Sequence, residues 1–237
     1  MFRNHASGSC LLCGYSTDPH SALCNACLLE LPYLDNPCRR CALELGLDAP
    51  NHTYCEQCLL EPPFFDYCFA LGRYEYPLQE LITRFKFNAK LCSGRALSLA
   101  LLREKGFAML QDPPEALLPV PLHAHRIRHR GFNQSIVMAK VLSKPLGGIP
   151  VLRQYCQRQR ATSTQRGLSA SERATNLRDA FVIAQPNERW QHIAIVDDVV
   201  TTKSTVNAIA QLLKNNGVKK VGVICLARVS EAPRTDT

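Results

Sequence analysis

Four CxxC pairs within the first 60 residues constrain the fold of this chain more than any other sequence feature. A CxxC turn points two thiolates at one ion, and a second pair completes the tetrahedral all-sulfur shell that structural zinc prefers. The spacing therefore predicts two consecutive zinc ribbons. One ion would be bound by Cys10, Cys13, Cys24 and Cys27, and the other by Cys38, Cys41, Cys55 and Cys58.

Redox-active or disulfide-forming cysteines are the alternative reading of these pairs. A thioredoxin-like site, however, is a single CxxC that opens a helix after a strand, and four spaced pairs do not match it. The segment also has too few large apolar residues for a core of its own, so bound metal would supply much of its stability. Because four thiolates leave no open coordination position, we expect structural rather than catalytic zinc.

The amino terminus and the apolar runs bear on where the chain resides. The first five residues lack the apolar segment of a secretory signal, and the longest apolar run is the seven residues 221–227. A bilayer-spanning helix needs roughly 18 such residues. We therefore expect no membrane insertion and a cytoplasmic, reducing environment.

Two adjacent prolines, Pro62 and Pro63, mark an extended joint after the last cysteine pair. Beyond them, apolar runs at residues 67–76, 117–121, 192–196 and 218–227 alternate with helical patterns at 77–87, 94–105, 133–144 and 204–215. This alternation predicts an α/β fold with a parallel sheet flanked by helices. We expect a double zinc ribbon over residues 1–62, an α/β domain over 63–228 and a frayed tail over 229–237.

Four further cysteines fall singly in the α/β domain. They are Cys68, Cys92, Cys156 and Cys225. Unpaired cysteines in such a context are typically small buried apolar residues, and we expect that role here.

The segment from residue 192 to 206 carries the strongest indication of a binding site. A buried strand ends at two carboxylates, Asp197 and Asp198, and a hydroxyl-rich turn then opens a helix. In a parallel sheet the ligand crevice lies at the carboxyl ends of the strands, where a helix N-terminus offers unpaired N–H groups to an anion. A ribose 5-phosphate would satisfy both the carboxylates and the turn, whereas an ordinary strand-turn-helix without ligand is the structural alternative.

This segment resembles the 5-phosphoribosyl 1-pyrophosphate (PRPP) motif of type I phosphoribosyltransferases. The resemblance implies that Asp197 and Asp198 hold the ribose hydroxyls and act in catalysis. It also implies that the 5′-phosphate is bound by the following turn, which comprises Val199, Val200, Thr201, Thr202, Lys203, Ser204 and Thr205. Magnesium would accompany PRPP.

Further motifs narrow the resemblance to the ComF family. They are residues 119–122 (PVPL), residues 130–135 (RGFNQS), and residues 161–165 (ATSTQ) with Leu168, Arg173, Asn176, Leu177 and residues 180–181. The paired zinc ribbons match that family too. The resemblance implies a type I phosphoribosyltransferase-like fold and a link to natural competence or to the use of DNA as a nutrient.

Lys203 departs from the family pattern, which has glycine at this position. The backbone there approaches the phosphate closely and can need a conformation that a side chain disfavours. The lysine could add a phosphate contact or could crowd the pocket.

Residues 123–178 carry eleven Lys and Arg residues and a single carboxylate, Glu172. Such a field favours phosphate-bearing partners. In the type I phosphoribosyltransferases that this chain resembles, the loop after the strand corresponding to residues 119–122 receives pyrophosphate. The resemblance therefore implies that role for Arg126, Arg128 and Arg130, with Asn133, Gln134, Arg160 and Arg166 as further candidates. The same arginines, with Phe132 and Tyr155 for stacking, could instead track single-stranded DNA.

Three functions remain open from the sequence. The chain could transfer phosphoribosyl from PRPP to an unknown acceptor, with catalysis by positioning and electrostatics. It could be a DNA-handling protein that works with uptake proteins, or a regulator that senses PRPP without consuming it. Pyrophosphate release, salt-dependent binding of single strands, and binding without turnover would distinguish them.

Overall fold

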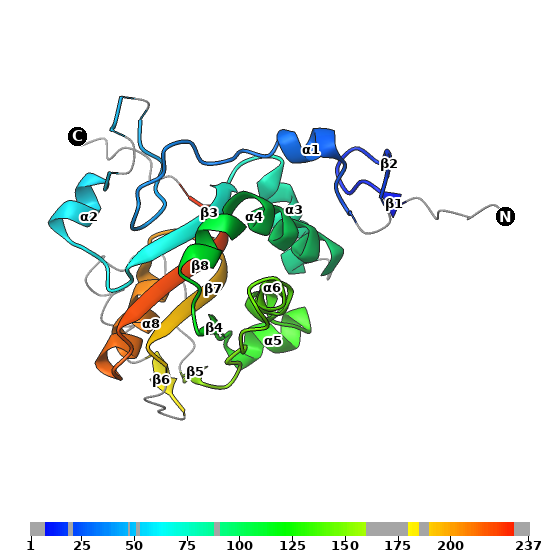
Figure 1. Cartoon of the computed structure of the whole chain (residues 1–237). Helices are drawn as coiled ribbons and strands as arrows, with labels where there is room; N and C mark the ends of the chain where they lie inside the picture. The colour runs from blue at the N-terminus through cyan, green and yellow to red at the C-terminus, as the bar shows by residue number, and fades with distance from the viewer. Residues whose placement is uncertain are drawn as a thin grey trace, which may run out of the picture.

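The computed structural model describes residues 8–18, 21–46, 48–50, 53–87, 91–159, 180–184 and 190–229. Its centre is a four-stranded parallel sheet in the order β3-β8-β7-β4 (Figure 1). These strands are β3 (Tyr67–Arg73), β4 (Ala116–Pro119), β7 (His192–Val200) and β8 (Lys220–Arg228). The predicted α/β class is confirmed. Within the described residues, no helix combines the length and apolarity needed to cross a bilayer.

Helices cover both faces of this sheet, because its strands alternate apolar side chains to either side. Ile193 and Ile195 of β7 face a cluster that includes Val206 and Ile209 of α8 (Ser204–Asn215). Ala194 of the same strand faces the opposite cluster. That cluster is formed with α3 (Leu78–Phe87), α4 (Leu91–Gln111) and α6 (Gln134–Ser143).

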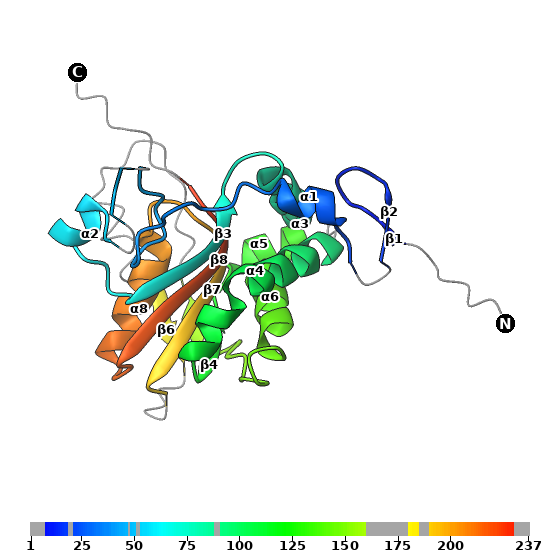
Figure 2. The same ribbon diagram turned by 45° about the horizontal axis from the view of Figure 1, so that its top comes forward.

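The cysteine-rich segment divides between the two faces (Figure 2). Its first part holds β1 (Gly8–Ser9), β2 (Ser16–Thr17) and α1 (Asn25–Leu29), and its Cys10 and Cys27 belong to the cluster with α3 and α4. Its second part holds α2 (Glu56–Leu60), and its four cysteines belong to the cluster with α8. Each part therefore packs against a different face of one sheet.

Several local expectations need correction. The segment of Arg126 to Arg130 is helical, as α5 (Ala124–Arg130), with His123 as N-cap and Gly131 in the left-handed region as C-cap. β7 continues through the acidic pair to Val200, because Val199 and Val200 still pair with Ala227 and Arg228 of β8. Cys92 is exposed, whereas Cys68, Cys156 and Cys225 are buried as expected.

Two short strands pair with each other near the C-terminal end of the basic segment, residues 123–178. β5 (Cys156–Arg158) pairs antiparallel with β6 (Phe181–Ile183), a pairing that the sequence patterns did not indicate. Tyr155, just before β5, is buried in the cluster with α8, so it is not available to stack on a nucleic-acid base. Phe132 packs beside Phe85, with ring centroids 5.7 Å apart.

Candidate functional site

The end of β7 and the start of α8 form the candidate phosphate-binding turn, residues 201–205. α8 begins without a side-chain hydrogen bond at its N-cap, Lys203, so its first backbone N–H groups have no side-chain acceptor there. Thr202 Oγ1 and Ser204 Oγ lie 2.9 Å apart at the turn. A helix N-terminus with such N–H groups and neighbouring hydroxyls is suited to bind a phosphate.

The acidic pair lies directly before this turn, and partners from two helices hold it. Lys86 Nζ of α3 lies 3.0 Å from Asp198 Oδ1, and Gln134 Nε2 of α6 donates to Asp198 Oδ2 at 3.1 Å. Ser135 Oγ donates to Asp197 Oδ1 at 3.3 Å. The pair is thus a convergence point of β7, α3 and α6.

The surroundings of Asp197 shift its pKa. Burial raises the pKa of Asp197 to about 7, and the adjacent charge of Asp198 adds to the rise. Hydrogen bonds from the Asp198 N–H and Ser135, together with the charge of Lys86, act in the opposite direction. Asp197 therefore titrates in the neutral range.

Gln134 carries an unsatisfied atom at this point. Its Nε2 faces the Asp198 carboxylate, and its Oε1 is buried with no hydrogen-bond partner among the described residues. Exchanging the two amide atoms would set two oxygens against each other, so the carbonyl must point away from Asp198. The Gln134 amide therefore fixes Asp198 from within the protein, and its carbonyl does not face the acidic pair.

Arginines from α5 and β5 surround the acidic pair. Burial lowers the pKa of the Arg130 and Arg158 guanidinium groups, and the charge of nearby Arg126 lowers both further. Asp198 opposes the shift at Arg130, and Asp197 opposes it at Arg158, so positive charge gathers around the carboxylates. Arg130 also lies over the Phe87 ring, 5.0 Å from its centroid.

The other basic candidates are less closely connected to the pair. Arg128 is exposed on α5. Arg160 and Arg166 lie outside the described residues. Asn133 is buried and caps α6, since its Oδ1 accepts from Ser135 N at 2.9 Å and its Nδ2 donates to Val120 O at 3.0 Å. Its amide is thereby engaged in holding α6 against the end of β4.

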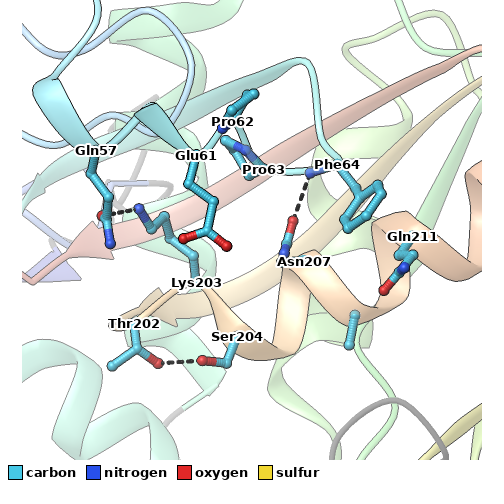
Figure 3. A pocket seen from close by; sticks show the side chains of 11 residues that line it. Gln57, Glu61, Pro62, Pro63, Phe64, Thr202, Lys203, Ser204, Asn207 and Gln211 are labelled. Atoms are coloured by element: carbon cyan, nitrogen blue, oxygen red, sulfur yellow. Dashed lines mark hydrogen bonds between the residues drawn. The ribbon is translucent and has the colours of Figure 1, made fainter. Parts of the chain in front are cut away.

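Lys203 adopts the conformation that glycine favours, with φ 65° and ψ −10°. Its Nζ donates to Gln57 Oε1 of α2, so the ammonium group is directed toward the cysteine-rich segment (Figure 3). The side chain is only 8% exposed. Neither the phosphate contact nor the crowding considered from the sequence describes this arrangement.

A pocket of about 410 Å³ lies at this junction (Figure 3). It is lined from one side by Gln57, Glu61 and residues 62–64, and from the other by residues 202–204 and three residues of α8. Phe64 N donates to Asn207 Oδ1 at 2.7 Å across it. The second half of the cysteine-rich segment therefore meets the phosphate-binding turn directly.

The eight cysteines form two clusters, as the spacing predicts. Within each cluster the sulfur atoms lie within 4.8 Å of one another, which fits a single tetrahedral ion. Backbone N–H groups support the sulfurs: Cys24 N donates to Cys10 Sγ at 3.4 Å, and Cys55 N donates to Cys38 Sγ at 3.2 Å. The first zinc site (Cys10, Cys13, Cys24, Cys27) exposes Cys13, whereas all four cysteines of the second zinc site (Cys38, Cys41, Cys55, Cys58) are buried.

Sequence reasoning did not single out two residues that contact the acidic pair. They are Lys86 and Ser135. Ser135 stands inside the RGFNQS motif, which could have indicated it. Lys86 gives no such signal, because a lysine in the last turn of an amphipathic helix is ordinary.

Comparisons with known proteins agree with this architecture. A family model described as a double zinc ribbon domain matches residues 7–59, and one described as a phosphoribosyl transferase domain matches residues 132–236. A purine phosphoribosyltransferase structure from Pyrococcus horikoshii aligns with 58% of this chain and 76% of that chain at 19% identity. Its TM-score is 0.34, so the likeness carries no argument about the site.

Two curated relatives align along most of the chain. Competence protein F of Haemophilus influenzae is 38% identical over 216 residues, covering 88% of this chain and 91% of that protein. DNA utilization protein YhgH of Escherichia coli (strain K12) is 37% identical over 231 residues, covering 93% and 90%. The chain is thus a phosphoribosyltransferase-like protein with a double zinc ribbon, and it belongs to the ComF family, with competence protein F and DNA utilization protein YhgH.

Proposed function

We propose that this protein binds PRPP at the carboxyl end of β7 and serves the use of external DNA, in keeping with the names of its relatives. The observation that carries the proposal is the acidic pair at the end of β7, which is held by Lys86 and Ser135 and is followed directly by an N-terminus of α8 without a side-chain cap. Together these groups match a ligand that has hydroxyls at one end and a phosphate at the other.

Each group has a separate role in this proposal. Asp197 and Asp198 accept hydrogen bonds from the ribose hydroxyls, and residues 201–205 donate to the 5′-phosphate. Arg130 and Arg158, which interact electrostatically with the acidic pair, supply positive charge to the diphosphate. Lys86, which pairs with Asp198 in this structure, moves to the diphosphate when the ribose arrives. Carboxylates near a developing ribose cation and arginines near the leaving group would lower the barrier to transfer. The acceptor of the phosphoribosyl group is open.

Magnesium fits this donor set only in part. Carboxylate oxygens are ligands that magnesium prefers, and it commonly combines one or two of them with phosphate oxygens. Lys86 holds one oxygen of Asp198 in this structure. Magnesium bound with PRPP would supply positive charge at the diphosphate.

Calorimetric titration of the zinc-loaded protein with PRPP and magnesium tests the proposal. We expect saturable binding that is lost in an Asp197→Asn, Asp198→Asn variant. Asp112→Asn is the matched control, because Asp112 pairs with Lys220 at the opposite end of the sheet and should leave binding unchanged. An unmodified protein that gives no heat with PRPP would contradict the proposal.

Single-stranded DNA is the second candidate ligand. Arg126 and Arg128 are exposed on α5 beyond the acidic pair, where they could contact further phosphates. An Arg126→Ala, Arg128→Ala variant should then lose affinity for single strands and show a shallower salt dependence, with PRPP binding retained. If the affinity for single-stranded DNA depended equally on salt in the variant and the unmodified protein, the exposed face of α5 would be excluded as the DNA-binding surface.

A further inference from the structure

Arg228, the last residue of β8, connects the second zinc site to the phosphate-binding turn. Its side chain is 1% exposed. Nε donates to the carbonyl of Cys41, a ligand residue of the second zinc site, at 3.1 Å. Nη1 donates to Val200 O at 3.2 Å and also to Thr201 O. One guanidinium thus joins the zinc loop to the end of β7.

These carbonyls determine how the turn presents its N–H groups. In a planar trans peptide the C=O and the following N–H point in opposite directions. Arg228 holds the carbonyl of Thr201. The N–H of Thr202, in the same peptide unit, is therefore directed away from Arg228. The carbonyl of Val200 also accepts from Val229 N at 3.0 Å, so the sheet already orients the N–H of Thr201. Arg228 therefore orients one donor of the phosphate-binding turn, the N–H of Thr202, and reinforces a second.

A second contact joins the same two parts. Gln57 lies on α2 between the zinc ligands Cys55 and Cys58, and it accepts the hydrogen bond from Lys203, the N-cap of α8 (Figure 3). The second ribbon therefore holds the turn at two positions. One is Thr201, through Arg228, and the other is Lys203, through Gln57. The first ribbon is held elsewhere, where Arg84 Nη1 of α3 donates to Leu11 O at 2.8 Å.

Charge favours the arrangement as well. A zinc ion bound by four thiolates has a net charge of about −2, which a buried guanidinium beside it complements. Loss of the ion would free the loop that carries Cys41, because these ligands are what hold it closed. The carbonyl of Cys41 would then no longer fix Arg228.

We infer that Arg228 is a positioning residue for the phosphate-binding turn, and that through it the second zinc site sets the affinity of the turn for a phosphate ester. The inference deepens the proposed function and rests on it for the identity of the ligand. Because binding linkage is reciprocal, a ligand in the turn must also retain zinc at the second site.

Two arginine variants separate this role from general stability. Arg228→Met keeps the apolar stem but cannot donate to the three carbonyls. Arg73→Met is the matched control, because Arg73 of β3 also joins the second ribbon to the sheet, through Glu44 at 2.6 Å, but contacts no residue of the turn among the described contacts. With two zinc ions bound in each protein, we expect Arg228→Met to weaken PRPP binding about tenfold and Arg73→Met to leave it within about twofold.

Equilibrium competition for zinc with a chromophoric chelator measures the reverse direction in the unmodified protein. Saturating PRPP with magnesium should raise the zinc affinity of one of the two sites, and Arg228→Met should remove that effect. Unchanged zinc affinity of both sites while PRPP is bound would overturn the inference, as would unweakened PRPP binding by folded Arg228→Met. This measurement still decides the matter if Arg228→Met does not fold.

Hydrogen exchange separates this inference from the proposed function, since it needs no ligand. Cys58→Ala should speed amide exchange at Asn207 and Val229, whose N–H groups donate to the carbonyls of Lys203 and Val200 at the turn. Cys27→Ala, which removes the corresponding ligand of the first site, should speed exchange only around its own ribbon. Unchanged exchange at these two amides in Cys58→Ala would overturn the coupling. If calorimetry shows no PRPP binding but exchange in the turn depends on Cys58, the ligand is wrong and the coupling holds.

Discussion

Lys203 combines an unfavourable backbone conformation with a favourable side-chain contact. A left-handed conformation costs a side-chain-bearing residue about 1 kcal/mol relative to glycine, and a hydrogen bond such as that to Gln57 contributes about as much. We therefore expect Lys203→Gly to change the free energy of unfolding by less than about 1 kcal/mol.

A double-mutant cycle by denaturant unfolding checks this balance. Gln57→Ala should lower the free energy of unfolding by about 1 kcal/mol in the unmodified protein and by almost nothing in Lys203→Gly. Equal losses in both backgrounds would show that the contact contributes nothing to stability.

Asp197 makes ligand binding depend on pH near neutrality. Its pKa is raised to about 7, so its carboxylate is increasingly protonated below that pH. A protonated carboxyl is a poorer acceptor for a ribose hydroxyl. We expect PRPP affinity to fall below pH 7, by up to about tenfold per pH unit. Calorimetry at pH values from about 5.5 to about 8.5 should show this dependence of PRPP affinity on pH in the unmodified protein. The dependence should be weaker in Asp197→Asn.

The same pKa shift has a consequence for stability with the opposite sign. Because the folded-state pKa lies above the ordinary aspartate value of 3.8, folding favours the protonated form, and stability falls as pH rises from about 4 to about 7. Asp197→Asn lacks this loss. Its melting temperature should exceed that of the unmodified protein at pH 8 by more than at pH 4, and an identical difference at both pH values would contradict the assignment.

Residues of the acidic pair could be identified from the sequence, but their partners could not. Asp197 and Asp198 belong to a pattern of apolar strand, carboxylates and hydroxyl-rich turn that consists of consecutive residues and is therefore visible in the sequence. Lys86 reaches Asp198 only because α3 and β7, far apart in sequence, are brought together by the fold. Contacts of this kind have no local signature.

At the scale of single elements, Asn133 is the N-cap of α6 and also a tie to β4. Removing a cap of this type costs about 1 kcal/mol. Asn133→Ala should lower the free energy of unfolding by about that much or more, since the bond to Val120 O is lost too. Asn133→Ser keeps a capping acceptor without setting an oxygen against Val120 O, so its loss should be smaller. Thermal unfolding of the pair gives the comparison, and equal losses would place the contribution in the Val120 bond.

Hydrophobic periodicity predicted the positions of the long helices. It did not predict the short elements, which depend on capping residues or on contacts with other parts of the chain. The helices of residues 77–87, 133–144 and 204–215 appear within a few residues of their predicted positions as α3, α6 and α8. α5 was expected as a loop because the resemblance to type I phosphoribosyltransferases implies a pyrophosphate loop there, yet an N-cap at His123 and a C-cap at Gly131 suffice for a short helix. β5 and β6 have only three residues each, too few for a period to register.

At the scale of the whole molecule, the two zinc sites should differ in lability. Cys13 of the first site is exposed, whereas every ligand of the second site is buried. A chelator needs access to the ion, so we expect zinc release in two phases of one ion each, with the faster phase from the first site. Cys27→Ala should abolish the fast phase and keep the slow one. A single phase with two ions would mean that both sites open together.

The division of the ribbons between the two faces of the sheet makes the domains mutually dependent. Cys10, Leu23 and Cys27 cover apolar side chains on one face, and Leu34, Cys38 and Cys55 cover those on the other. Truncating the chain at the Pro62–Pro63 joint would expose apolar side chains beside the helices on both faces, so the remainder should aggregate rather than fold as a smaller domain. A relative that has lost its cysteines must therefore carry either a different cover or polar substitutions on both faces, and the ribbons cannot be exchanged between proteins as independent modules.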